Sequence, residues 1–170
     1  MDLGILILRI VVGLVLTIHG SQKLFGWFGG GGIKGTLRMT EMLGLRPARF
    51  WAAMVTAGEF GGGLLLASGL FSPLGPLGIA AAMVVASLLV HRGKGFFAAK
   101  GGHEYSLTLF ASAVAIALTG PGRYSLDAVL STAIPGSVAI ALTVLTVIGI
   151  MGAMASRRPS APQPAAPAAA

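Results

Sequence analysis

Five long apolar runs divide this chain and constrain what it can fold into. A helix needs about 20 mainly apolar residues to cross roughly 30 Å of hydrocarbon. Each run is close to that length, although the fourth is short, and they cover residues 3–24, 50–70, 74–91, 105–120 and 135–155. The sequence therefore predicts an all-α, polytopic membrane helix bundle, with a four-helix core and a fifth, C-terminal transmembrane helix.

The composition agrees with a membrane protein. Hydrophobic residues make up 55% of the chain and charged residues 10%, and the mean hydropathy is +0.86. Soluble domains average about 25% charged residues. The 26 glycines are spread through the apolar runs, which is typical of helices that pack closely in lipid. The absence of cysteine excludes disulfide formation, thiol catalysis and thiolate metal ligation.

The basic residues indicate an orientation in the membrane. Lys and Arg outnumber Asp and Glu by seven charges, but they cluster between the apolar runs, so we interpret them as a topology signal and expect no nucleic acid partner. Only Arg123 falls on one side. Ten fall on the other side: Lys23, Lys34, Arg38, Arg46, Arg49, Arg92, Lys94, Lys100, Arg157 and Arg158. The positive-inside rule then predicts an external N-terminus and a cytoplasmic C-terminus.

Two charged residues lie inside apolar runs. Arg9 interrupts the first run and Glu59 lies near the middle of the second. A charge at the centre of a bilayer costs roughly 2.5–3.5 kcal/mol on insertion scales, so we predict that the two pair with each other in the bundle core. The pair either fixes the register of two helices or also contacts a ligand or moves a proton. A buried ion pair is weak evidence of net stabilisation.

A second group of polar residues converges at one depth. In the predicted orientation, His19, Lys23, His91 and Tyr105 reach the cytoplasmic half from three helices. We predict that they line a ligand-binding pocket with Glu59 at its inner end. The alternative is that they extend outward separately, as lysines at an interface commonly do. His19 and His91 could also join His103 and Glu104 in a metal or haem site, but their spacing matches no metal motif, and we assign no metal ligand and no catalytic residue.

Five ordered segments resemble the DoxX family of small bacterial integral membrane proteins. They are HGSQKLFGWFGG at 19–30, AGEFGGG at 57–63, His91 with KGFF at 94–97, GHEY at 102–105, and TGPGRYSLD at 119–127. The resemblance implies a four-helix bundle over 1–130. An additional transmembrane helix over 131–156 and a disordered Pro/Ala-rich tail over 157–170 would then depart from the family pattern. It also implies a multi-pass location in the bacterial cytoplasmic membrane.

The resemblance also bears on function. DoxX-like proteins are similar to the small membrane subunit of thiosulfate:quinone oxidoreductase, which makes quinone the candidate cofactor or substrate. Without a cofactor, no residue here can cycle electrons, so we expect at most a subunit of an oxidoreductase complex. Its partners would be the lipid bilayer, a redox partner on the cytoplasmic side, and a second copy of the chain. The alternatives are a non-catalytic anchor for a cytoplasmic enzyme, or a small transporter that uses Glu59 as its proton carrier.

Overall fold

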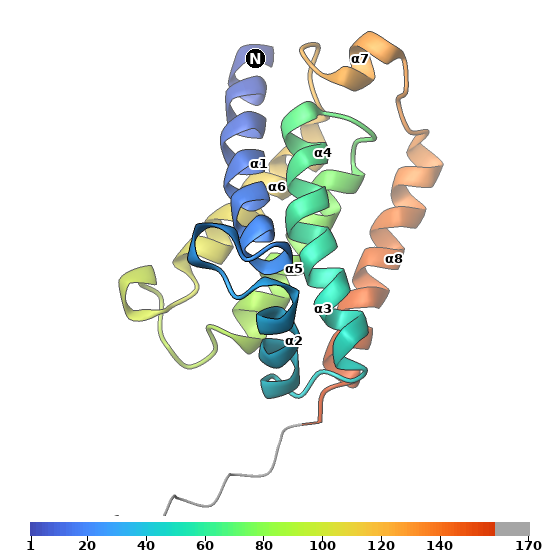
Figure 1. The fold of residues 1–170 in the computed structure, drawn as a ribbon. Helices are drawn as coiled ribbons and strands as arrows, with labels where there is room; N and C mark the ends of the chain where they lie inside the picture. The colour runs from blue at the N-terminus through green and yellow to red at the C-terminus, as the bar shows by residue number, and fades with distance from the viewer. Residues whose placement is uncertain (159–170) are drawn as a thin grey trace, which may run out of the picture.

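The computed structural model describes residues 1–158, and every regular element within that range is a helix (Figure 1). The α-helices are α1 (Asp2–Leu24), α2 (Gly32–Met42), α3 (Ala48–Thr56), α4 (Gly62–Ser68), α5 (Leu74–Leu89), α6 (Glu104–Thr119), α7 (Leu126–Leu130) and α8 (Gly136–Ala155). Two short 3-10 turns are η1 (Trp27–Gly29) and η3 (Ala98–Lys100), and a π-helical turn, η2 (Ala57–Gly61), joins α3 to α4. The predicted all-helical membrane bundle is confirmed.

Three helical segments are long and apolar enough to cross a membrane. They are α1, the continuous segment Ala48–Ser68 made of α3, η2 and α4, and α8. The apolar helices α5 and α6 have 16 residues each, just under the usual 17–25 residues of a transmembrane helix. The number of spans predicted from the sequence, five, therefore stays a prediction.

The core of the bundle lies between α1, α4, α5 and α6. Its most buried apolar side chains come from all four helices: Leu16, Leu66, Ile79, Ala113 and Ile116. Helix α8 packs along α5 at the edge of this bundle and, among its own residues, buries only Ala153 (Figure 1). It is as peripheral as its uniformly apolar sequence suggests.

Glycines allow α1 and α4 to approach each other closely. A Cβ atom on Gly13 would lie 2.7 Å from the carbonyl oxygen of Gly63, and one on Gly63 would lie 2.6 Å from the backbone nitrogen of Thr17. A Cβ atom on Gly20 would collide with the backbone of Phe60. Small residues at such positions let helix backbones meet where no apolar side chain fits. The contacts at Gly13 and Gly20 also fix the antiparallel register of the two helices.

Gly20→Leu is expected to lower the free energy of unfolding by about 1–3 kcal/mol, because the new side chain forces α1 away from Phe60. The matched control is Gly4→Leu on the same helix, where a Cβ meets nothing within 4 Å. The measurement is the midpoint of thermal unfolding in detergent. Equal midpoints for the two variants would contradict the close approach.

The predicted disordered tail falls mostly outside the described residues, which end at 158. Its first two residues are attached to the loop after α2. The Nε of Arg157 donates to the carbonyl of Leu43 at 3.1 Å, and the backbone N–H of Arg158 donates to the carbonyl of Gly44 at 2.8 Å. The end of α8 is thus held against the α2–α3 loop.

Candidate functional site

Glu59 is a buried carboxylate with one charged partner. It lies in the π-helical turn η2 and is only 2% exposed. Both carboxylate oxygens accept from the Nζ of Lys23, which reaches across from the last turn of α1 and keeps 26% of its side chain exposed. A π-helical turn inserts an extra residue into a helix and is frequent at functional sites. Here it places a paired charge in the interior of the bundle.

His19 and Tyr105 form a contact between α1 and α6. The phenolic oxygen of Tyr105 lies 3.0 Å from the Nε2 of His19, and the two ring centroids are 5.7 Å apart. Both side chains are exposed, Tyr105 by 41%. Either group can donate or accept, so the proton of this hydrogen bond can belong to the phenol or to the imidazole.

His91 follows α5, and its ring is oriented by the next loop. Its Nδ1 lies 2.7 Å from the carbonyl oxygen of Gly101. A carbonyl only accepts, so Nδ1 carries a proton and the Nε2 of the neutral ring is an acceptor. His91 therefore presents one free ring nitrogen in a fixed orientation.

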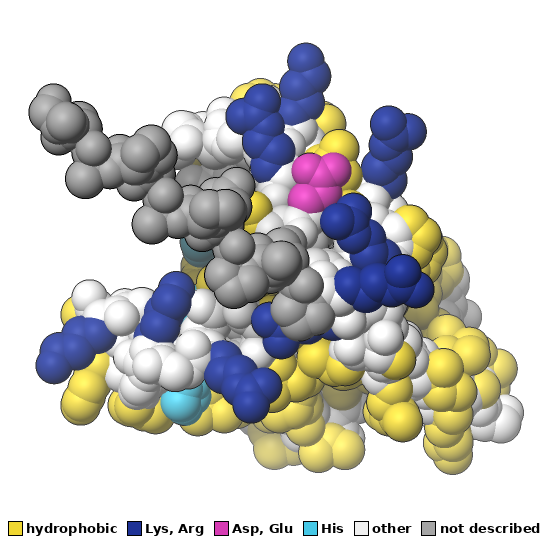
Figure 2. Space-filling model, turned by 90° about the horizontal axis from the view of Figure 1, so that it is seen from below, with side chains coloured by type: hydrophobic (Ala, Val, Ile, Leu, Met, Phe, Trp, Pro, Cys, Tyr) yellow, Lys and Arg dark blue, Asp and Glu magenta, His cyan; other side chains and the backbone are white. Residues whose placement is uncertain are grey.

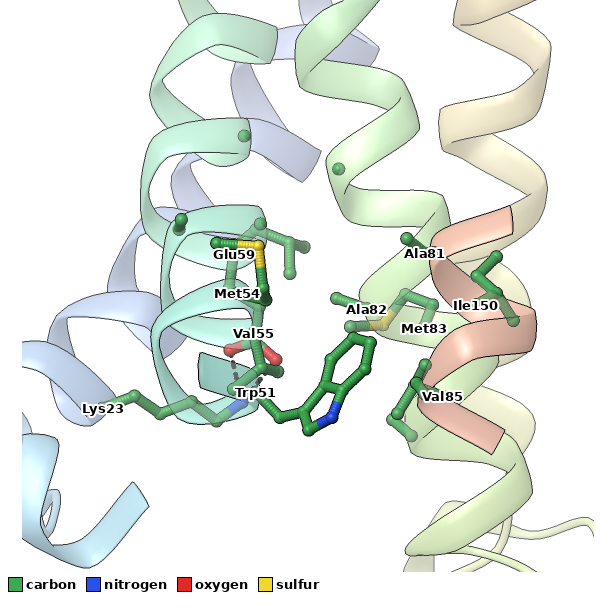
Figure 3. Close-up of a pocket in the computed structure, with 18 of the residues that line it drawn as sticks. Lys23, Trp51, Met54, Val55, Glu59, Ala81, Ala82, Met83, Val85 and Ile150 are labelled. Atoms are coloured by element: carbon green, nitrogen blue, oxygen red, sulfur yellow. Dashed lines mark hydrogen bonds and ion pairs between the residues drawn. The ribbon is translucent and has the colours of Figure 1, made fainter. Parts of the chain in front are cut away.

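One cavity of about 680 Å³ joins these residues. All five residues predicted to bind a ligand line it: His19, Lys23, Glu59, His91 and Tyr105. In Figure 3 the Lys23–Glu59 pair lies on one side, and the Trp51 ring extends from α3 toward residues of α5 and α8. Pockets of 300–1,000 Å³ with mostly apolar walls and a few polar groups are typical small-molecule sites. The predicted pocket residues converge, and their binding of a ligand stays a prediction.

Several residues of the cavity were missed by the sequence reasoning. Trp51 is one, and Ser106 is another, whose hydroxyl lies 2.7 Å from that of Ser87. Helix α8 contributes Thr146, Gly149, Ile150 and Ala153. Their i, i+3, i+4, i+7 spacing places them on one helix face, but α8 is apolar on every face, so the sequence does not distinguish this face from the others.

Arg9 does not pair with Glu59, so this prediction is wrong. The guanidinium is 1% exposed, and its Nη1 and Nη2 donate to the carbonyls of Pro121 and Tyr124 at 2.8 and 3.0 Å. These carbonyls lie in the loop between α6 and α7, at the end of the bundle where α1 begins (Figure 1). Glu59 packs against the other end of α1, close to Lys23 and far from Arg9. Each buried charge has a partner, but a different one from that predicted.

Asp127 joins two loops at the end of the bundle where Arg9 lies, and the sequence analysis assigned it no role. Its carboxylate accepts from the backbone N–H groups of Phe71 and Ser72, both at 2.8 Å, and from the Thr132 hydroxyl at 2.8 Å. It is also the acidic residue that acts electrostatically on Arg9. Asp127 therefore connects the α4–α5 turn to the loop that Arg9 holds.

The alternative metal site is not assembled within residues 1–158, where no three His, Asp or Glu residues lie close enough to hold one ion. Glu104 instead accepts from the backbone N–H of Ala98 at 2.9 Å, and the His103 ring packs edge-on against Phe96. Both residues shape the loop between α5 and α6.

The end of the bundle nearest this cavity carries most of the positive charge. Figure 2 views it from below and shows Lys and Arg side chains around much of the face, with one acidic side chain among them. We name this surface the basic face. The exposed basic residues of the loops and helix ends there are Lys34, Arg38, Arg46, Arg49, Arg92, Lys94, Lys100, Arg157 and Arg158.

Comparison with known proteins identifies one family and two similar bacterial proteins. The family model DoxX matches residues 4–92. The putative oxidoreductase CatD of Bacillus subtilis (strain 168) is 29% identical over 126 residues, covering 74% of this chain and 86% of that protein. The inner membrane protein YqjF of Escherichia coli (strain K12) is 29% identical over 134 residues, covering 76% and 94%. No solved structure matches the chain significantly. Since the family match spans more than half of its length, the chain belongs to the DoxX family.

Proposed function

We propose that this protein is a membrane subunit of a redox-linked system in the bacterial cytoplasmic membrane and that its cavity binds the head group of a quinone. The observation that carries the proposal is the convergence of His19, Lys23, Glu59, His91 and Tyr105 on one cavity inside an apolar helical bundle. The name of the relative CatD, putative oxidoreductase, and that of YqjF, inner membrane protein, support the class and the location.

The polar groups match the needs of a quinone ring. Its two carbonyl oxygens accept hydrogen bonds, and Lys23, His19 and Tyr105, which line the cavity, can donate them. Reduction to the hydroquinone takes two electrons and two protons. In this proposal the exposed His19–Tyr105 pair, joined by a contact of 3.0 Å, passes protons inward. The electrons come from a partner protein, since the 170-residue sequence has no cysteine and its other side chains do not cycle electrons unaided.

The basic face is the proposed docking surface for that partner. In the proposed orientation, with the N-terminus outside, this face meets the cytoplasm, as the positive-inside rule favours. Complementary charge steers association and fixes its geometry. An electron donor with an acidic surface would then be held at the end of the bundle nearest the Lys23–Glu59 pair.

Tyr105→Phe is expected to lower the amount of quinone that copurifies with the protein by about two- to tenfold. The variant loses one hydrogen-bond donor to the ring, and one hydrogen bond is worth about 0.5–1.5 kcal/mol. The measurement is mass spectrometry of quinones extracted from protein purified out of native membranes. Tyr124→Phe is the matched control, since Tyr124 lies outside the cavity and contacts Arg123 at the opposite end.

The amount of quinone retained also distinguishes a quinone-binding subunit from a non-catalytic anchor. The basic face equally favours a non-catalytic anchor that holds a cytoplasmic enzyme at the membrane. If unsubstituted protein retained no more quinone than an unrelated membrane protein purified in parallel, the quinone function would be contradicted. The anchor would then be the preferred function.

A further inference from the structure

The cavity continues past its polar residues into an apolar gap between α3 and α8. Trp51 and Met54 line it from α3, and Gly149 and Ile150 line it from α8 (Figure 3 labels all of these but Gly149). Helix α8 packs along α5, and residues of α3 line the same cavity. A Cβ at Gly152 of α8 would lie 3.9 Å from the Cη2 of Trp51.

The gap is open and apolar. Gly149 is exposed and lines the cavity, and a Cβ added there would meet nothing within 4 Å. The α3 residues at its edge, Phe50 and Met54, are exposed large hydrophobics. The helices on both sides are candidate membrane spans, so this edge of the cavity faces lipid rather than water.

We propose that this gap is the subsite for the hydrocarbon tail of the quinone, and that Trp51 and Gly149 determine which tails the protein accepts. The inference rests on the proposed function and adds the substrate class, a long-tailed membrane quinone rather than a water-soluble one. Polar groups are concentrated at Lys23 and Glu59, so the ring binds there and its tail leaves along the apolar walls. The gap joins the ring site to the outer edge of the cavity, so the ring and the tail occupy one continuous space.

Helix α8 gives this chain its tail subsite. The family match ends at residue 92, and α8 begins at Gly136. The ring site therefore comes mostly from the matched segment, while one wall of the tail subsite does not. Without α8, the α3 face of Trp51 and Met54 would lie open to lipid, and a tail would not be held between two helices.

The test compares two quinones that share one ring. Menaquinone carries a long prenyl tail and menadione carries none. The protein is reconstituted in phosphatidylcholine nanodiscs with Trp27→Phe as background, which leaves Trp51 as the sole tryptophan of the 170-residue sequence. Trp27 does not line the cavity. Quenching of Trp51 fluorescence then reports each ligand, with Gly149→Phe as the test variant and Ile148→Phe, on the lipid-exposed side of the same helix, as the control.

Gly149→Phe is expected to weaken menaquinone binding by about tenfold or more, since displacing about two methylene-sized groups from the gap suffices for that change. The affinity for menadione should stay within about twofold, and Ile148→Phe should change the affinity for neither ligand.

Three outcomes would contradict these expectations. Unchanged binding of both ligands in Gly149→Phe, or equal weakening of both, would overturn the tail subsite and leave the ring site standing. Absence of saturable quenching by either quinone in the background protein would overturn the proposed function itself. Quenching of Trp51 by brominated phosphatidylcholine that added menaquinone does not relieve would assign the gap to lipid chains and overturn the inference.

Discussion

Arg9→Met is expected to lower the free energy of unfolding by about 3–5 kcal/mol. The variant keeps an unbranched, shorter apolar side chain and removes the donors to Pro121 and Tyr124. Hydrogen bonds to a charged group contribute about 1.5–3 kcal/mol each, and losing one partner of a buried charge cluster is among the most destabilising changes known. Asp127 also loses its nearby positive charge. The measurement is thermal unfolding in detergent, together with the yield of folded protein from membranes.

Two further variants separate charge from geometry at Arg9. Arg123→Met removes an exposed arginine whose ion pair with Asp2 spans 3.6 Å, and it should change stability by less than about 0.5 kcal/mol. Arg9→Lys retains the charge but has only one nitrogen to share between two carbonyls, so an intermediate loss is expected. A stability for Arg9→Met equal to that of Arg123→Met would show that the two carbonyl contacts do not hold the loop.

The Lys23–Glu59 pair is expected to respond asymmetrically to substitution. Lys23→Met should cost about 3 kcal/mol, because it leaves Glu59, 2% exposed, as an unpaired buried carboxylate. Glu59→Gln should cost less, because Lys23 keeps 26% of its side chain exposed and can turn its ammonium outward. The measurement is again thermal unfolding in detergent, on single and double variants made in parallel.

The double variant Lys23→Met with Glu59→Gln is the decisive member of this set. It should be more stable than Lys23→Met alone, since no unpaired charge is left inside the bundle. Simple addition of the two single losses would contradict a direct interaction between the residues. The exposed Asp2–Arg123 pair provides the reference cycle, for which a coupling within about 1 kcal/mol is expected.

The incorrect prediction for Arg9 shows that the pattern of apolar runs does not determine the register between two helices. Depth in the membrane was estimated from the ends of the runs, whereas the real register is fixed by Gly20 meeting Phe60 and Gly13 meeting Ala67. In that register Glu59 lies level with residue 21, about 12 residues from Arg9, which is about 18 Å along the helix. No arginine side chain spans that distance. The partners of Arg9 are backbone carbonyls, which leave no signature in a sequence.

The pocket residues were easier to predict because they needed only approximate depth. His19, Lys23, His91 and Tyr105 all lie near one end of an apolar run, so an error of a turn does not move them out of reach of one another. The π-helical turn at Glu59 and the wall formed by α8 were not predictable in the same way. The glycines beside the turn, Gly58 and Gly62, lie close to α5, which no local sequence pattern indicates, and α8 has no charged residue to mark an inward side.

The position of Arg9 also has a consequence for biosynthesis. The arginine belongs to α1, but the carbonyl of Pro121 that accepts its hydrogen bond is made 112 residues later. At about 5–20 residues per second, the interval is on the order of ten seconds. During that time α1 carries a charge without its final partners. A nascent chain that stops before the loop at Pro121 would keep the arginine of α1 without these two carbonyl partners.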